Sequence, residues 1–447
     1  MTSKRKQAHD DSRKLQEARE ARQRAMRIDL ANPRALFNLG STQAGLGQWL
    51  KAAGLFRQVL ALEPGHIDAS IGLANCLMKQ GDPGSAETTL KGVLEVVPGH
   101  LEAHEMLIKV HHQQNNPSKI HQEHLRRALF SDGVAGPKAE FEVAHASLVH
   151  GEMPLGWDQY EARFEVPGLI HPVRSFTQPR WHGEPFPGRT LLLHYEQGFG
   201  DTLMFVRYAP MVKALGGKVL LVAQAPLADL VATCGGIDEV IPANRPLPDF
   251  DLHLPLLSLP RIFRTDLDSI PAEIPYLDVP DQVPNRQRIA EILSTSEGQI
   301  RIGLVWAGSS THKRDGERSI PPALLAPLGA LPEVAWHSFQ LGATGDVPLP
   351  GLVSLDPCIR NFSDTAYALS GMQLVITVDT ALAHLAGALG IPTLLLVSFL
   401  PDFRWMLGRE DSPWYPTMRI YRQPRLGDWE AVIQQVLADL RGDQDGL

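Results

Sequence analysis

Two neighbouring segments near the N-terminus repeat each other with a period of 34 residues. Residues 32–65 read NPRALFNLGSTQAGLGQWLKAAGLFRQVLALEPG, and residues 66–99 read HIDASIGLANCLMKQGDPGSAETTLKGVLEVVPG. The matched positions are Leu39-Gly40 with Leu73-Ala74, Gly47 with Gly81, Ala52 with Ala86, Phe56 with Leu90, and Pro64 with Pro98. Small residues recur where two helices must approach closely, and a proline closes each unit. The period therefore predicts a stack of helical pairs in the front part of the chain.

This pattern resembles the tetratricopeptide repeat, because the period and the residue types agree at several positions. Weaker copies extend it: Asn116-Pro117 takes the place of Asp82-Pro83, and residues 18–25 fit the second helix of a preceding partial repeat. Residues 156–165 (GWDQYEARFE) are predicted to form a final helix that closes the stack. We therefore expect an all-α tetratricopeptide-repeat solenoid over residues 1–166.

The sequence leaves two roles open for these repeats. They either only scaffold the chain, for example as a homodimer, or their concave face holds an acceptor protein or peptide. Six histidines lie between His100 and His124, and His100, His104 and His111 have helical spacing. No cysteine or carboxylate completes a compact ligand set, so we interpret these histidines as solvated helix surface and expect no metal.

Proline usage changes along the chain. Residues 1–150 contain 6 of the 35 prolines, and the remaining 297 residues contain 29. Since proline interrupts helices and suits turns between elements, the chain is expected to be helical in front and α/β behind. A hydrophobic fraction of 44% is sufficient for buried cores in both parts.

Other features exclude whole classes of protein. Three distant cysteines exclude a disulfide framework and a CxxC zinc or redox site. A net charge of −8 argues against a nucleic-acid partner. The longest apolar stretch, residues 374–400, contains Asp379, His384 and Pro392, so no membrane span is predicted. Residues 1–30 lack the apolar core of a secretory signal, and a cytoplasmic protein is expected.

Two sets of strand, turn and helix follow a proline-rich linker. The predicted strands cover residues 189–195, 218–223, 239–242, 299–306, 333–340, 374–378 and 393–397. Helices are expected over residues 202–215, over 363–370 with Ser363 as N-cap, and over 429–440. Short apolar runs of this kind are typical of buried parallel strands. We predict two Rossmann-like halves, residues 167–285 and 286–447, with a ligand cleft between them.

Asp201 follows the turn Gly198-Phe199-Gly200, where a strand meets a helix. Glycines there allow a ligand to approach closely. A carboxylate at this place is suited to act as a general base on an attacking hydroxyl. The alternative is that Asp201 only caps the helix that begins at Thr202.

Asp379 and Thr380 open a second helix at the end of another strand. The free N–H groups and the dipole of a helix N-terminus suit a phosphate, and the Thr380 hydroxyl adds a donor. A bare carboxylate repels phosphate, so Asp379 is assigned a sugar hydroxyl or a helix-cap role. His384 lies one turn further in, either towards the same ligand or as a core histidine.

Residues 312–318 (HKRDGER) place cations near the end of the strand over residues 299–306. Cations stabilise the negative charge that develops on a departing nucleotide diphosphate. Arg318 is the preferred residue and Lys313 the second. The alternative is a solvated charged loop.

With these motifs in place, residues 189–435 resemble the glycosyltransferase family of the lipopolysaccharide heptosyltransferases, glycosyltransferase family 9, in a form commonly attached to tetratricopeptide repeats. The segments that carry the resemblance are Gly200-Asp201-Thr202-Leu203, Gly235-Gly236-Ile237-Asp238-Glu239-Val240, Arg318-Ser319-Ile320-Pro321, and residues 378–392 (VDTALAHLAGALGIP). The resemblance implies the two-domain GT-B fold and transfer without a metal ion. Ala381, where these enzymes usually have Gly, and Arg318, where many have Lys, weigh against a heptose donor more than against transferase chemistry.

The same resemblance implies a role for each candidate residue. Asp201 is implied to be the catalytic base. Ser309, Ser310 and Arg318 are implied to hold the donor pyrophosphate. Asp379, Thr380 and His384 are implied to contact the nucleotide sugar, and Gly198 and Gly200 to let it approach.

We therefore expect a glycosyltransferase that moves a sugar from a nucleotide-sugar co-substrate to a hydroxyl of an acceptor, on a protein that the repeats present, with inversion. This organisation also resembles protein O-glycosyltransferases, including bacterial flagellin-modifying ones. Two alternatives stay open: a non-catalytic repeat adaptor or scaffold with a degenerate GT-B unit, and a sugar-nucleotide epimerase on the same fold.

Overall fold

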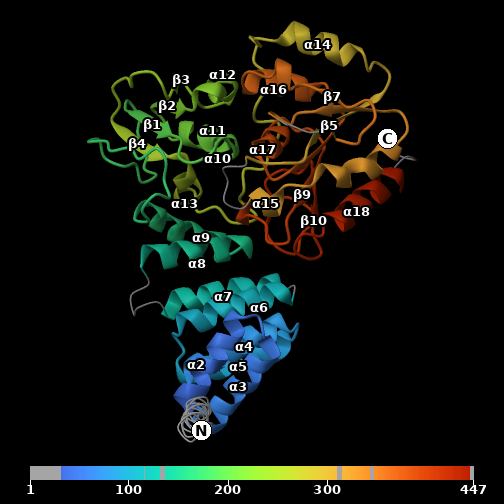
Figure 1. The fold of residues 1–447 in the computed structure, drawn as a ribbon. Coiled ribbons are helices and arrows are strands. Elements are labelled where there is room, and N and C mark those ends of the chain that lie inside the picture. Colours follow the sequence, from blue (N-terminus) through green and yellow to red (C-terminus); the bar gives the residue numbers. More distant parts are fainter. Residues whose placement is uncertain (1–31, 115, 131–135, 310–314, 343–346, 443–447) are drawn as a thin grey trace, which may run out of the picture. The chain divides into compact units, whose positions relative to one another are not determined.

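A computed structural model describes residues 32–114, 116–130, 136–309, 315–342 and 347–442 (Figure 1). It divides into two compact units, residues 1–134 and residues 135–447. None of the helices in the described ranges is long and apolar enough to cross a lipid bilayer.

The first unit consists of antiparallel helical pairs, as the repeat predicts. Its helices are α2 (Pro33–Gly45), α3 (Trp49–Leu62), α4 (Ile67–Lys79), α5 (Pro83–Val96), α6 (Leu101–Gln113) and α7 (Pro117–Phe130). Phe56 fills the space between two of them, because Gly40 and Gly72 leave room for its ring: a Cβ on either glycine would lie 2.9 or 2.7 Å from it. The small residues of the repeat are thus required by the packing of one aromatic side chain.

Two of the histidines in α6 are not on a solvated surface, which corrects the sequence interpretation. His104 and His111 are each 1% exposed. The ring of His104 bonds the Glu123 carboxylate at 2.9 Å and the carbonyl oxygen of Pro98 at 2.8 Å. The Glu123 carboxylate of the next helix, α7, makes the burial of the His104 ring possible. The spacing of histidines within α6 gives no sign of this partner.

The second unit begins with helices α8 (Pro137–Val149) and α9 (Met153–Tyr160) and the 3-10 turn η1 (Glu161–Phe164). The sequence analysis assigned these residues to a helical domain that ends at residue 166. In the structure these helices belong to the second of the two compact units. Trp157 gives the physical reason, because its indole packs edge-on against Phe205 and Trp414 of the α/β elements.

Two parallel sheets follow, which confirms the predicted fold class. The first has the order β3-β2-β1-β4 and consists of β1 (Thr190–His194), β2 (Lys218–Ala223), β3 (Glu239–Pro242) and β4 (Leu252–Pro255). The second has the order β10-β9-β8-β5-β6-β7 and consists of β5 (Ile300–Val305), β6 (Val334–Ser338), β7 (Val353–Ser354), β8 (Leu374–Val378), β9 (Thr393–Val397) and β10 (Met418–Arg422).

Helices and 3-10 turns connect and cover the strands. In the first half these are α10 (Phe199–Phe205), η2 (Val206–Tyr208), α11 (Ala209–Lys213), α12 (Ala228–Val231) and α13 (Leu259–Ile262). In the second half they are α14 (Arg286–Ser294), α15 (Asp315–Arg318), α16 (Phe362–Ser370), α17 (Ala381–Ala388), η7 (Phe403–Trp405) and α18 (Trp429–Gly442). The N-cap of α16 is Asn361, not Ser363 as expected, because the Asn361 side chain accepts a hydrogen bond from Asp364 N at 3.0 Å.

A pair of histidines lies between neighbouring strands β1 and β4. His194 Nε2 is 3.3 Å from His253 Nδ1, and the Phe176 ring packs against both imidazoles. Burial, the other imidazole and the Arg174 guanidinium lower the pKa of His194 to about 3. Burial and Arg180 also lower the pKa of His253. The folded state therefore keeps both rings neutral at pH 7.

The histidine pair predicts a stability that falls in mild acid. The unfolded chain protonates histidine near pH 6.5, while the folded chain resists protonation, so the folded state binds fewer protons below that value. Stability is fully present above about pH 6.5 and decreases towards about pH 3, by up to about 1.4 kcal/mol per pH unit for His194.

Thermal unfolding at about pH 7.5 and about pH 5 tests this expectation. In His194→Gln the difference between the two midpoints should be smaller than in the wild-type chain. His182→Gln, which changes an exposed histidine of the same unit, should keep the wild-type difference. Equal pH dependence in His194→Gln and the wild-type chain would contradict the assignment.

Candidate functional site

The candidate site is a cleft in the α/β unit with a volume of about 1400 Å³. Its lining includes loops that follow the carboxyl ends of β1, β5, β8 and β9, where ligands bind in folds with parallel strands. Helix α10, which follows β1, packs against helix α17, which follows β8. The two halves therefore meet beside the cleft.

The cleft collects most of the residues that the sequence singled out. Those that line it are Gly198, Gly200, Asp201, Ser309, Arg318, Asp379, Thr380 and His384. Ser310 and Lys313 lie outside the described residues. Three motifs that are far apart in the sequence thus meet in one place.

Asp201 has two partners, one for each carboxylate oxygen. Its Oδ2 accepts a hydrogen bond of 2.8 Å from the N–H of Gly198, the N-cap of α10. Its Oδ1 accepts from Nη2 of Arg404, which belongs to the other half. Burial raises the pKa of Asp201, and Arg404 offsets part of that increase. The carboxylate takes part in the helix cap and also lines the cleft, with 14% of its side chain exposed.

Arg404 and Asp402 are site residues that the sequence analysis missed. They lie in and just before η7, in the segment that follows β9. Asp402 Oδ1 accepts hydrogen bonds from Arg404 N at 3.1 Å and from Arg404 Nη1 at 2.6 Å. Burial alone would raise the pKa of Asp402, but Arg404 outweighs it and holds the pKa at about 2. The only sequence signal was their place after a predicted strand whose carboxyl end borders the cleft.

Arg318 lies flat against the loop that follows β5. A Cβ on Gly308 would lie 2.3 Å from the Arg318 guanidinium, so a side chain there would displace the arginine from its present position. Arg318 Nη1 donates to the carbonyl oxygen of Asp379 at 3.2 Å, and Arg318 Nε donates to Asp315 at 3.4 Å. The Arg318 side chain is 18% exposed and lines the cleft.

Thr380 and His384 behave differently at the start of α17. Thr380 is the N-cap, and its buried Oγ1 has no hydrogen-bond partner among the described residues. His384 is 4% exposed, bonds the Tyr415 hydroxyl at 2.9 Å, and stacks on Trp405 with 5.1 Å between ring centroids. Burial lowers the pKa of His384 to about 3, so the ring is neutral at pH 7.

Gly200 is required by the neighbouring imidazole of His384. A methyl group at Gly200 would lie 2.8 Å from His384 Cδ2. The glycine therefore serves the contact between α10 and α17. Gly200 also lines the cleft, where the sequence analysis predicts that it lets a ligand approach.

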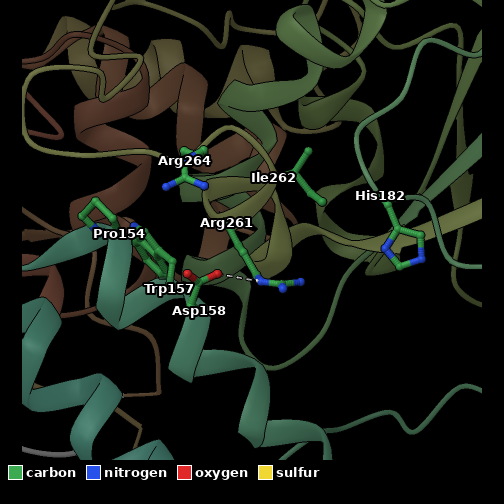
Figure 2. A pocket seen from close by; sticks show the side chains of 7 residues that line it. All are labelled: Pro154, Trp157, Asp158, His182, Arg261, Ile262 and Arg264. Atoms are coloured by element: carbon green, nitrogen blue, oxygen red, sulfur yellow. Dashed lines mark hydrogen bonds and ion pairs between the residues drawn. The ribbon is translucent and has the colours of Figure 1, made fainter.

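Figure 2 shows a second, smaller cavity of about 360 Å³ that contains none of the predicted residues. It lies at α9 and α13 and is lined by Pro154, Trp157, Asp158, His182, Arg261, Ile262 and Arg264. Asp158 accepts from Arg261 Nε at 3.0 Å, which is the dashed contact in the figure. The chemistry-bearing residues thus gather in the larger cleft.

Comparison with known proteins gives one family match and one curated relative. The tetratricopeptide-repeat family matches residues 43–109. The relative is the protein FlbA of Caulobacter vibrioides, which is 27% identical over 346 residues, or 70% of this chain. The chain spans 57% of the length of that relative.

Several solved structures share part of the architecture. A glycosyl transferase of family 9 from Veillonella parvula is 10% identical, with a TM-score of 0.44, over 59% of this chain and 99% of that chain. The ADP-heptose lipopolysaccharide heptosyltransferase II of E. coli is 14% identical, with a TM-score of 0.39, over 57% of this chain and 98% of that chain.

The pair of Arg404 with Asp201 predicts a large loss of stability when the arginine is removed. Arg404→Met leaves two carboxylates of the cleft without their cation, which should lower the free energy of unfolding by about 3–5 kcal/mol. Arg409→Met is the matched control, because Arg409 pairs with Asp411 at the surface and its loss should cost about 1 kcal/mol or less.

Denaturation of the single and double variants measures the coupling. Asp201→Asn combined with Arg404→Met should cost less than the sum of the two single changes, since one change already breaks the pair. Additive losses would show that the two side chains do not interact.

Proposed function

We propose that the α/β unit is a glycosyltransferase that transfers a sugar from a nucleotide-sugar donor to an acceptor hydroxyl, with inversion and without a metal ion. The observation that carries this proposal is the meeting of a carboxylate, Asp201, and a guanidinium, Arg318, in one cleft at the ends of parallel strands. Such a cleft has the two groups that a displacement of this kind needs, a proton acceptor and a cation.

Asp201 is the general base in this proposal. The Gly198 N–H orients its carboxylate, and burial raises its pKa, which improves it as a proton acceptor. The acceptor oxygen gives its proton to Asp201 and forms a bond to the anomeric carbon of the donor. The bond from that carbon to the diphosphate oxygen breaks at the same time. Attack in line with the leaving group inverts the anomeric centre.

Arg318 and Thr380 stabilise the leaving diphosphate. Arg318 brings a positive charge beside the backbone of Asp379, where α17 begins. The Thr380 hydroxyl, which has no hydrogen-bond partner among the described residues, and the N–H groups of the first turn of α17 can donate to phosphate oxygens. Charge that develops in the transition state is thus met by fixed donors. Ser309 and His384, which line the same cleft, contact the donor in this proposal. Ser310 and Lys313 are assigned the same role, and both lie outside the described residues.

The acceptor in this proposal is a protein that the repeat unit presents. The match of residues 43–109 to the tetratricopeptide repeat supports a protein-binding role for that unit. A catalytic unit and a protein-binding unit in one chain suit the modification of a bound protein. Such a transferase acts in the cytoplasm, where nucleotide sugars are available.

A scaffold with a degenerate GT-B unit is the second candidate, and one observation favours it. Arg404 occupies one oxygen of Asp201, and an ion pair makes a carboxylate a weaker base. A scaffold is expected to bind no nucleotide, whereas an epimerase would turn over the donor without an acceptor. Nucleotide binding and acceptor dependence therefore separate the three functions.

Nucleotide binding is the first test. At 100 times its Kd, a ligand adds about 2.7 kcal/mol of stability, which a thermal-shift screen with UDP, GDP, ADP, CMP and their sugars detects. Arg318→Gln should abolish the shift. Arg245→Gln, an exposed arginine outside the cleft, should retain it. No shift of the wild-type chain with any of these nucleotides would favour the scaffold.

Asp201→Asn separates chemistry from binding. The variant should keep the thermal shift with the nucleotide but lose transfer by roughly 10²-fold or more, because the base is gone. Release of nucleotide from the donor in the presence of acceptor measures the transfer. A transfer rate equal to wild type would overturn the assignment of the base.

A further inference from the structure

Three aromatic side chains of the cleft lining come from the helical hairpin that precedes the sheets. Phe141 and His145 of α8 and Tyr160 of α9 line the same cleft as Asp201. Figure 1 shows α9 beside α13, with α8 on the other side of α9, below the first sheet. The segment that the sequence assigned to the repeats is therefore a wall of the candidate site.

His145 lies next to the residues that hold the proposed base. Its ring centroid is 5.2 Å from that of Phe403, and its charge would lower the pKa of Asp402. Phe403 in turn carries the Arg404 guanidinium on its ring face at 4.3 Å. His145 is thus linked to Asp201 through Phe403 and Arg404 of η7.

The hairpin is fixed to the loop that carries the base. Arg163, directly after α9, donates to Glu196 from Nη2 at 2.7 Å and from Nε at 3.1 Å. The two side chains are 0% and 2% exposed. Since Glu196 follows β1 and precedes the Gly198 turn, this buried pair sets the position of the hairpin relative to Asp201. A binding surface on α8 would therefore be pre-organised.

The charge and shape of this wall favour a particular acceptor. Two carboxylates, Asp201 and Asp402, share the single Arg404 guanidinium, so an anionic group beside them is repelled. The partly exposed rings of Phe141 and His145, which pack on the buried Tyr160, offer apolar and polar edges that an uncharged chain can contact. The same chain carries tetratricopeptide repeats over residues 43–109, a repeat typical of protein-binding units, and this favours a polypeptide over a free sugar.

We infer that α8 forms the acceptor subsite and that His145 and Phe141 determine its specificity for an uncharged, hydroxyl-bearing peptide. This inference rests on the proposed glycosyl transfer. It adds a role for a segment outside the two sheets and a chemical class for the acceptor.

The test measures acceptor-stimulated release of nucleotide from the donor found in the thermal-shift screen, using the full chain. The acceptors are a capped Gly-Ser-Gly peptide, the same peptide with phosphothreonine beside the serine, and methyl β-glucopyranoside. The neutral peptide should stimulate release, and the other two should not. In His145→Gln and Phe141→Leu the KM for the neutral peptide should rise about tenfold, which corresponds to about 1.4 kcal/mol of binding free energy. The change in kcat should be smaller.

Glu140→Gln is the matched control, because Glu140 is an exposed residue of α8 outside the cleft lining. It should retain the wild-type KM. An unchanged KM in His145→Gln and Phe141→Leu would overturn the subsite, and release with the glucoside but not with the peptide would overturn the acceptor class. No release with any acceptor from a chain that binds the nucleotide would also overturn that class. Absence of nucleotide binding in the wild-type chain would instead mark failure of the proposed function.

Discussion

Arg404 is the residue on which the arrangement of the cleft depends most. Its guanidinium belongs to the second half, yet it donates both to Asp402 beside it and to Asp201 across the cleft. Removing such charges from water costs several kcal/mol for each ion, and only a complete set of partners repays it. The Arg404 side chain is 9% exposed, so water can replace little of what its partners supply. The position of Asp201 therefore depends on the contact between the two halves as well as on the Gly198 N–H, and the proposed base and the cleft form one structural unit.

Two further contacts cross between the halves and fix the same geometry. Arg207 donates to the carbonyl oxygen of Trp414 at 2.6 Å, and its guanidinium lies 4.5 Å from the ring centroids of both Tyr276 and Tyr415. Gly200 allows the His384 ring to close the contact between α10 and α17. These groups are buried, and their partners are rigid rings and backbone. The geometry of the cleft beside α10 and α17 is therefore determined by packing more than by loop conformation. The α8–α9 hairpin, which forms a wall of the cleft, is also fixed by packing of buried groups, because Arg163 pairs with Glu196 in the loop after β1.

The sequence predicted the parallel strands well, and the reasons are physical. Residues 218–223, 374–378 and 393–397 form strands with the predicted bounds, because strands covered on both faces appear as unbroken apolar runs between turn residues. Strand β4 was missed, since Leu252–Pro255 is short and contains a histidine and a proline. Apart from their place after a predicted strand, Asp402 and Arg404 had no signal in the sequence, because the main partner of Arg404 in the other half is Asp201, some 200 residues away. The α8–α9 hairpin was assigned to the repeats for the same reason: its helical pattern is visible in the sequence, but the aromatic partners that bind it to the sheets are not.

The protonation state of Asp379 affects how a cleft rich in carboxylates can accept a diphosphate. A fixed negative charge at the start of α17 would repel phosphate. Burial and the neighbouring Asp402 raise the pKa of Asp379, so less free energy is needed to protonate it near neutral pH than for an ordinary aspartate. An arriving diphosphate adds negative charge and raises that pKa further, so binding and proton uptake favour each other. In the proposed function, a neutral Asp379 carboxyl would donate a hydrogen bond to a phosphate oxygen that the ionised form would repel. Arg318 donates to the backbone of the same residue. The Arg318 guanidinium, which is always charged, and the Asp379 carboxyl, which can take up a proton, therefore lie together where the phosphates are proposed to bind.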